Sequence, residues 1–503
     1  MTTQIRQLLA QARASGDADA MLHAGATALQ AGADEEAVEP VRDALRRHPR
    51  HPQLWHLYAL LHRDLQDLAV SVEAFGRAAE LAPDDPMIAH GRACVAYEAG
   101  LPAARHFERA MRLNPSDRAI VLRHAAALIA EDRGEEAIGN IARGLARDPR
   151  WLEGQAALAR VRWLRGEQEG FGAGYEKAVA AHPRDAALWR AWLELLIQVG
   201  LHERALAVVA RARAAAGQSP TFDAVEAIAR SERGELAAAD ALFAGLASLN
   251  DLNLVVHNLR HLLRAGRPAE AAALGEKHAP SDPTHHVWPH LSVAWRLLGD
   301  PRWEELEGDP SFVGIYDLAD SLPPLDALAA RLRALHLTTR HPLDQSLRGG
   351  TQTEGDLFSR IEPEIVALRK AVVAAVERHV ASLPPPLEGH PLLLPRRGPI
   401  RFSGSWSVRL AGGGRHVDHY HPMGWISSAL YISLPEEAER GTGEAGWLKL
   451  GEADVLGLDL PPIRTVEPRP GRLILFPSYM WHGTRPFEGG ERLAVAFDVK
   501  RPG

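Results

Sequence analysis

Prolines recur along the first half of the chain at a nearly constant interval. They stand at positions 49, 83, 115, 149, 183 and 220, so that successive prolines are 34, 32, 34, 34 and 37 residues apart. A period near 34 residues is typical of helix–turn–helix units that bury their apolar faces only by stacking on their neighbours. The spacing therefore predicts an all-α solenoid for this part of the chain.

The residues around each proline agree with this prediction. In RLNPSDRAIVLRHAAALIAEDRG and AHPRDAALWRAWLELLIQVG, one helix ends before the proline, and a second follows with apolar residues three and four positions apart. Ala93, Ala125 and Ala159 each stand ten positions after a proline, and their small side chains let neighbouring helices approach closely. These stretches resemble tetratricopeptide repeats over about residues 1 to 300.

The resemblance implies a right-handed solenoid of about eight repeats whose concave face can hold an extended peptide or a helix. We therefore expect a protein or peptide partner on the repeats. The alternative is that the solenoid only stabilises or dimerises the neighbouring domain.

Bulk composition excludes several classes of protein. The chain has 503 residues, which is too long for a single hydrophobic core, and its net charge of −7 argues against a nucleic-acid binder. Cys94 is the only cysteine and cannot form an intramolecular disulfide, and the first residues lack the pattern of a signal peptide. No run approaches eighteen apolar residues, so we expect a cytoplasmic protein that does not associate with membranes.

The sequence pattern changes near residue 300. We predict a solenoid over residues 1–300, a helical linker over 301–340 and a second domain over 341–503. The second domain contains one long amphipathic helix that stops at three prolines beginning with Pro384, and beyond it apolar residues alternate with a period of two. The expected strands are RFSGSWSVRL, WISSALYISL, GWLKLG, RLILFP and RLAVAFDVK, which together predict a double-stranded β-helix, or jelly roll, with helices on its outside.

A histidine-dense segment, HVDHYH at residues 416–421, carries the chemistry of this domain. His482 follows His421 after 61 residues, and Arg492 comes ten residues later. Residues separated by one position project from the same face of a strand, so this segment offers pairs of metal ligands. Imidazole and carboxylate ligands that leave coordination positions open suit non-haem Fe(II) oxygenases, and a guanidinium binds a carboxylate through two parallel hydrogen bonds.

Two longer stretches resemble a specific family. SWSVRLAGGGRHVDHYHPMGWISSALYISLP and PGRLILFPSYMWHGTRPFEGGERLAVAFDV are similar to the 2-oxoglutarate- and Fe(II)-dependent oxygenases that often follow tetratricopeptide repeats in bacterial proteins. The resemblance covers roughly residues 340 to 503 and implies Fe(II), 2-oxoglutarate as cosubstrate and dioxygen. It also implies that Arg492 binds the far carboxylate of 2-oxoglutarate. Ala494 replaces a hydroxyl residue of many relatives, which leaves room for Ser427, Ser428 or Tyr431 to contact the cosubstrate.

The metal ligands can be chosen in two ways. The wider superfamily uses His-x-Asp, which His416 and Asp418 match, whereas this group has the pattern His-x-x-His-x-His-Pro, whose last two histidines are His419 and His421. Both choices share His482 as the third ligand. We expect His419, His421 and His482 to bind iron, with His416 and Asp418 as the competing pair.

An oxygenase joined to peptide-binding repeats suggests a hydroxylase of a protein or peptide side chain. The first alternative is an oxygenase of a small-molecule or carrier-bound substrate, with the repeats serving assembly. The second is a non-catalytic scaffold. Arg348, in the polar segment SLRGGTQT, is expected either to bind a substrate carboxylate or to form a surface ion pair.

Overall fold

The computed structural model describes residues 2–247, 251–343 and 345–502. It divides into two compact units, one formed by residues 1–143 with 355–366 and the other by residues 144–354 with 367–503. The domain boundaries predicted at residues 300 and 340 remain predictions. In the described part of the chain, no helix is long and apolar enough to cross a membrane.

The first unit consists of paired helices. Asp85 stands two residues after Pro83 and caps the following helix, because its side chain accepts hydrogen bonds from the backbone N–H groups of Met87 and Ile88. Ala93, predicted to lie where helices meet, is fully buried. The helices are α1 (Thr2–Ser15), α2 (Ala18–Gln30), α3 (Asp34–Arg47), α4 (Pro52–Asp64), α5 (Leu68–Leu81), α6 (Pro86–Glu98), α7 (Ala104–Leu113), α8 (Arg118–Ala130) and α9 (Gly134–Arg147), the last of which ends just past the unit boundary.

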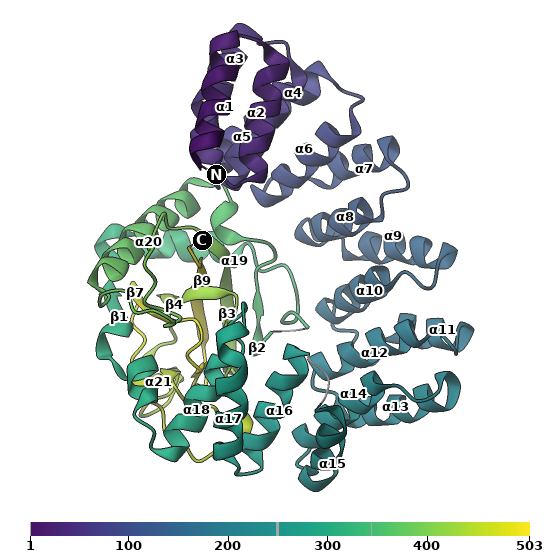
Figure 1. Ribbon diagram of the computed structural model, residues 1–503, viewed down its shortest axis with the longest axis vertical. Coiled ribbons are helices and arrows are strands. Elements are labelled where there is room, and N and C mark those ends of the chain that lie inside the picture. Colours follow the sequence, from purple (N-terminus) through teal and green to yellow (C-terminus); the bar gives the residue numbers. More distant parts are fainter. Residues whose placement is uncertain (1, 248–250, 344, 503) are drawn as a thin grey trace. The chain divides into compact units, whose positions relative to one another are not determined.

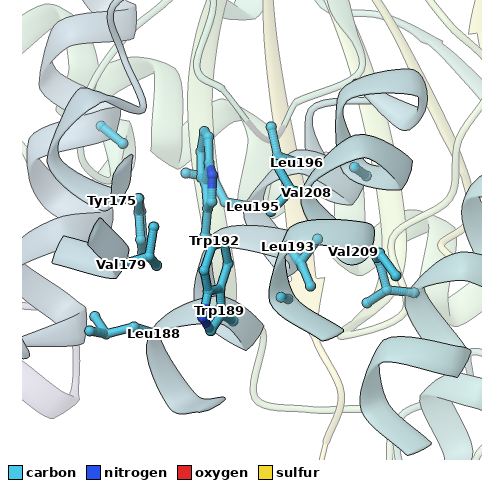
Figure 2. Close-up of a cluster of buried hydrophobic side chains, with 14 of the residues drawn as sticks. Tyr175, Val179, Leu188, Trp189, Trp192, Leu193, Leu195, Leu196, Val208 and Val209 are labelled. Carbon is cyan, nitrogen blue, oxygen red and sulfur yellow. The ribbon is translucent and has the colours of Figure 1, made fainter. Parts of the chain in front are cut away.

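The second unit begins with further helix pairs of the same kind (Figure 1). One hydrophobic core of these helices surrounds Trp192, whose ring stacks on Tyr175 with centroids 5.2 Å apart, and Trp189 and Leu193 lie beside it (Figure 2). The helices are α10 (Leu152–Leu164), α11 (Ala173–Ala181), α12 (Ala186–Gln198), α13 (His202–Ala216), α14 (Pro220–Glu232), α15 (Leu236–Leu246), α16 (Leu252–Arg264), α17 (Pro268–His278) and α18 (Trp288–Leu298). The predicted tetratricopeptide-like solenoid is confirmed.

Two antiparallel sheets form the rest of the second unit. The larger sheet has the strand order β1-β7-β4-β9-β3-β2 (Figure 1), and the smaller has the order β6-β5-β8, as expected for a jelly roll. The strands are β1 (Gly314–Asp317), β2 (Leu347–Gln352), β3 (Phe402–His416), β4 (Gly424–Ser433), β5 (Leu448–Leu450), β6 (Arg464–Val466), β7 (Arg472–Pro477), β8 (His482–Thr484) and β9 (Glu491–Lys500). Every predicted strand is present, and β1, β2, β6 and β8 are additional.

Three helices of the described residues accompany these sheets. The first is α19 (Leu325–Arg333), the second is the predicted amphipathic helix, α20 (Pro363–Ser382), and the third is the short α21 (Glu437–Arg440). One face of α20 is fully buried at Leu368, Val372 and Val376, and Tyr316 on β1 contacts His379 through its hydroxyl. The helix ends before the three prolines, which lack the backbone N–H that would continue it.

The last repeats contact the strand-bearing segments through hydrogen bonds. The Trp481 indole donates to the carbonyl of Pro289, at the start of α18, over 3.0 Å. Arg264 at the end of α16 donates to the carbonyl of Val455 over 2.8 Å, and the Trp163 indole on α10 donates to that of His341 over 3.0 Å. The repeat helices of this unit thus bond to segments that flank the strands.

Candidate metal and cosubstrate site

Three histidines from two segments converge inside the jelly roll. His419 and His482 face each other as an antiparallel bridge and exchange two backbone hydrogen bonds of 3.0 and 2.8 Å. The backbone N–H of His421 donates to the carbonyl of Ser478 over 2.8 Å, which fixes the second histidine of the loop. One ring nitrogen from each histidine lies within 4.8 Å of those of the other two. This spacing suits three ligands of one metal ion.

Hydrogen bonds at Nδ1 orient all three rings. Nδ1 of His419 lies 2.8 Å from the carbonyl oxygen of Val417, and Nδ1 of His482 lies 2.9 Å from that of Met480. A carbonyl only accepts, so these Nδ1 atoms carry the proton and Nε2 is left with a free lone pair. Nδ1 of His421 lies 2.7 Å from a carboxylate oxygen of Asp498. Metal-binding histidines typically have such a partner on the second nitrogen.

The surroundings favour the neutral, ligand-competent form of the His419 and His482 rings. Burial, and then the adjacent His482, hold the pKa of His419 well below its usual value. Burial, and then His421, have the same effect on the pKa of His482. Since a metal binds only the deprotonated ring, the two histidines need not lose a proton on binding near neutral pH.

The alternative pair, His416 and Asp418, has different surroundings. Asp418 is buried, and its carboxylate accepts hydrogen bonds from the Lys449 ammonium over 3.1 Å and from the backbone N–H of Asp454 over 2.8 Å. Its other oxygen lies so close to Gly483 that a Cβ there would be 2.0 Å away. Asp418 therefore ties the histidine loop to neighbouring segments and lies outside the group of three converging ligands.

His416 contacts the site without joining the group of three. Its Nδ1 lies 3.1 Å from the Ser346 hydroxyl, and its ring is stacked on His419 with centroids 5.6 Å apart. Burial, and then the Arg492 charge, lower the pKa of His416 to about 3. In a regular strand His416 and His419 would face opposite ways, but β3 ends at His416 and the chain bends. Both rings therefore reach the same cavity.

A cavity adjoins the three histidines. Most of its walls are apolar, which limits access of water to the metal ligands. Besides the four histidines, the lining residues are Trp406, Val408, Leu410, Ser428, Ala429, Leu448, Phe476, Gly483, Thr484, Arg492, Ala494, Val495 and Ala496.

Arg492 supplies a buried positive charge in this cavity. Its side chain donates to the carbonyl of Gly446 over 2.9 Å and lies 4.7 Å from the centre of the Tyr431 ring. Its Nε and the Tyr431 hydroxyl are both buried without a hydrogen-bond partner, and no acidic residue that the structure describes forms an ion pair with it. A buried, unpaired charge is costly. The Arg492 guanidinium and the Tyr431 hydroxyl therefore fit an anionic ligand such as the far carboxylate of 2-oxoglutarate.

The hydroxyl of Ser428, another predicted contact of the cosubstrate, already has a partner in the fold. Ser428 lines the cavity, but its hydroxyl donates to the carbonyl of Phe497 over 2.9 Å and accepts from the Phe497 N–H over 2.8 Å. These bonds join β4 to β9 and occupy the hydroxyl. The contact of Ser428 with cosubstrate stays a prediction.

Two functional neighbours were missing from the sequence-based prediction. Asp498 orients His421, and Lys449 binds Asp418. Asp498 could have been found, because it follows Arg492 on β9 by an even number of residues and so lies on the same face. Nothing in the sequence pattern connects Lys449 with the histidine loop.

Comparisons with known proteins agree with this geometry. Residues 404–498 match the family model described as "Putative 2OG-Fe(II) oxygenase". No curated protein is significantly similar in sequence.

Solved structures are similar to parts of the chain. A tetratricopeptide repeat protein from Parabacteroides merdae is 16% identical over 48% of this chain and 96% of its own, with a TM-score of 0.31. A Pseudomonas putida prolyl-4-hydroxylase is 20% identical over 38% of this chain and 94% of its own, with a TM-score of 0.26. Yeast Tom70 is 15% identical over 55% of this chain and 61% of its own, with a TM-score of 0.35.

The matched residues include the three converging histidines and Arg492, and the segment that contains them has the predicted jelly-roll strands. The chain therefore carries a putative 2OG-Fe(II) oxygenase domain at its C-terminal end, and this domain follows a tetratricopeptide-like solenoid.

Proposed function

We propose that this protein hydroxylates a side chain of a protein or peptide, with Fe(II) bound by His419, His421 and His482. The convergence of these three histidines, each with its Nδ1 held by an acceptor, is the observation that carries the proposal. Three protein ligands leave coordination positions open for a bidentate cosubstrate and dioxygen. Bound Fe(II), 2-oxoglutarate and dioxygen supply the oxidising power that inserts an oxygen atom into a C–H bond.

The protein contributes binding, orientation and exclusion of water. Arg492 binds the far carboxylate of 2-oxoglutarate through its guanidinium, and the unpartnered Tyr431 hydroxyl donates a second hydrogen bond to the same group. Leu448 and Phe476 form apolar walls that keep bulk water from the reacting atoms. Asp498 holds the His421 ring so that its Nε2 faces the metal position.

A polypeptide substrate is favoured by the neighbourhood of the cavity. The helices α10 to α18 belong to the same compact unit as the sheets, so repeats that bind a polypeptide would hold it beside the jelly roll. Strand β2 is at the end of the larger sheet, where an extended chain can lie alongside it.

Iron content tests the ligand set. The full chain and its single alanine variants are loaded anaerobically with Fe(II), and bound iron is measured after removal of the excess. His419→Ala, His421→Ala and His482→Ala should each lose iron, whereas Asp418→Ala should retain it in the fraction that stays folded. Loss confined to His416→Ala, Asp418→Ala and His482→Ala would overturn the assignment.

Turnover tests the reaction. Iron-loaded protein is incubated with 2-oxoglutarate and candidate peptides, and succinate release is measured together with a gain of one oxygen atom by a peptide. We expect a peptide that raises succinate release and is itself oxygenated, with both effects absent in His482→Ala. Oxygenation of a small molecule, with no response to any polypeptide, would contradict the proposed substrate class.

A further inference from the structure

Two arginines face each other across an edge of the larger sheet. Arg348 on β2 and Arg415 on β3 are direct cross-strand partners, and both are exposed. Side chains of directly opposed residues project from the same face, and like charges in that position destabilise the pairing. In a surface with no other function, one of the two would ordinarily be neutral or acidic. The pair therefore needs an explanation.

Neither arginine is neutralised by the described part of the chain. Arg348 donates to the backbone carbonyls of Gln345 and Leu347, each over 2.8 Å, and no described acidic side chain forms an ion pair with Arg348 or Arg415. The surface ion pair considered for Arg348 from the sequence is thus not observed among these residues. The positive charge remains free to bind an external anion.

This pair lies beside the proposed metal cavity. The next cross-strand pair along the same strands is Leu347 with His416, and His416 lines the cavity. A groove runs along the glycines at 349 and 350 of β2, directly after Arg348, and it shares Leu410 with the cavity. Neighbouring residues of a strand face opposite ways, so the two arginines project from the face opposite His416, and a chain that lies along the edge of β2 can contact both faces.

The groove itself is positively charged. Arg340, His341 and Arg409 line it together with one acidic residue, Glu491, whose carboxylate is already bound by Arg409 and Arg333. Partial burial, and then the Arg348 and Arg340 charges, lower the pKa of His341 and so favour its neutral form, which leaves the arginines as the source of positive charge. The groove is therefore complementary to an acidic ligand.

We propose that this groove and the arginine pair beside it bind an acidic stretch of the polypeptide substrate, with an Asp or Glu carboxylate bound by Arg348 and Arg415. A polypeptide fits better than an isolated anion because β2 is an edge strand, and no described strand pairs with its outer side. An extended chain can add to such an edge through backbone hydrogen bonds while its side chains reach flanking sites. The proposal rests on the proposed function, since it places the substrate of that site.

Peptide binding tests this proposal without turnover. The full chain, loaded with a redox-inert divalent metal and 2-oxoglutarate, is titrated into fluorescein-labelled peptides, and fluorescence anisotropy gives Kd. One peptide contains Glu, Gly and Ser, and its counterpart has Gln at every Glu. We expect the acidic peptide to bind about tenfold more tightly, with a preference that weakens at high salt. The double variant Arg348→Gln/Arg415→Gln should lose the preference.

Three comparisons make the result decisive. Arg469→Gln removes an exposed arginine paired with Glu467 and should keep the preference. Arg348→Glu/Arg415→Glu should instead favour a Lys-containing peptide. Equal binding of both peptides by the wild-type chain, an unchanged preference in the double variant, or displacement by free glutarate at the same concentration as the peptide would each overturn the proposal. Iron content, measured on the same proteins, separates this failure from failure of the metal site.

Discussion

The contact between Asp498 and His421 gives a sharp test of how the metal ligands are oriented. The carboxylate oxygen lies 2.7 Å from Nδ1 of His421, and the Ser427 hydroxyl donates to the same oxygen over 2.6 Å. Asp498→Asn keeps the size of the side chain but removes its charge, so the bond to His421 becomes one between neutral groups. Hydrogen bonds to charged groups contribute about 1.5–3 kcal/mol. That range corresponds to roughly 10- to 100-fold in affinity.

We therefore expect Asp498→Asn to weaken anaerobic Fe(II) binding by roughly 10- to 100-fold, in line with the usual effect of losing a partner of a ligating histidine. Titration with Fe(II), followed by separation of bound from free metal, measures the change. Asp459→Asn, a substitution at an exposed aspartate, is the matched control and should leave the affinity unchanged. An unaltered affinity in Asp498→Asn would refute the view that this carboxylate orients a ligand.

Three further predictions concern charge. Arg492→Gln should weaken 2-oxoglutarate binding on the order of 100-fold, because it removes the buried pairing of the guanidinium with the far carboxylate, and the variant should retain iron. Calorimetry measures the affinity for 2-oxoglutarate, and an affinity equal to that of the wild-type chain would exclude the assigned role. Asp418→Ala should lower the free energy of unfolding by roughly 2 kcal/mol, because Lys449 is buried beside it, although Glu452 and Asp454 still contact that lysine. A urea titration measures the loss, and a neutral result would contradict it. Burial raises the pKa of Glu307 from 4.5 to about 7, so its protonated form is favoured in the fold. The contribution of protonated Glu307 to the free energy of unfolding is fully present below pH 4.5 and is lost as pH rises through about 7, a decline of ~3 kcal/mol. Glu307→Gln should abolish this decline, which unfolding curves measured across the same pH range would show.

Much of the fold follows from periodicity in the sequence. The strands β4, β7 and β9 alternate or concentrate apolar residues, and α20 has an apolar face, so local pattern and tertiary environment agree. Strand β2 could not be predicted in this way. Its sequence LRGGTQ contains two glycines and has little intrinsic strand preference, and pairing with β3 supplies the structure.

The candidate site was predictable in part. Spacing, together with the family resemblance, pointed to His482 and Arg492, which the fold brings to one cavity. The choice between the pair His419 and His421 and the pair His416 and Asp418 could not be made from the sequence. It depends on the bend after His416 and on the contact of Asp418 with Lys449, which is 31 residues away. Such long-range contacts leave no periodic signal.

The last repeats have a closer relation to the site than the sequence indicated. Tyr420 stands between two of the proposed ligands, and its ring lies 5.5 Å from His290 on α18 and 5.0 Å from Trp481. A truncation at residue 300 would remove α18 and expose this ring. Retained or lost turnover after such a truncation would therefore report on the stability of the site as well as on peptide binding.

The central claim is that His419, His421 and His482 hold the metal while Arg492 holds the cosubstrate. An anaerobic crystal structure of the full chain with a redox-inert divalent metal and 2-oxoglutarate tests it most directly. We predict metal on Nε2 of these three histidines and the far carboxylate on Arg492. Metal bound by His416 and Asp418, with Lys449 displaced, would contradict the assignment.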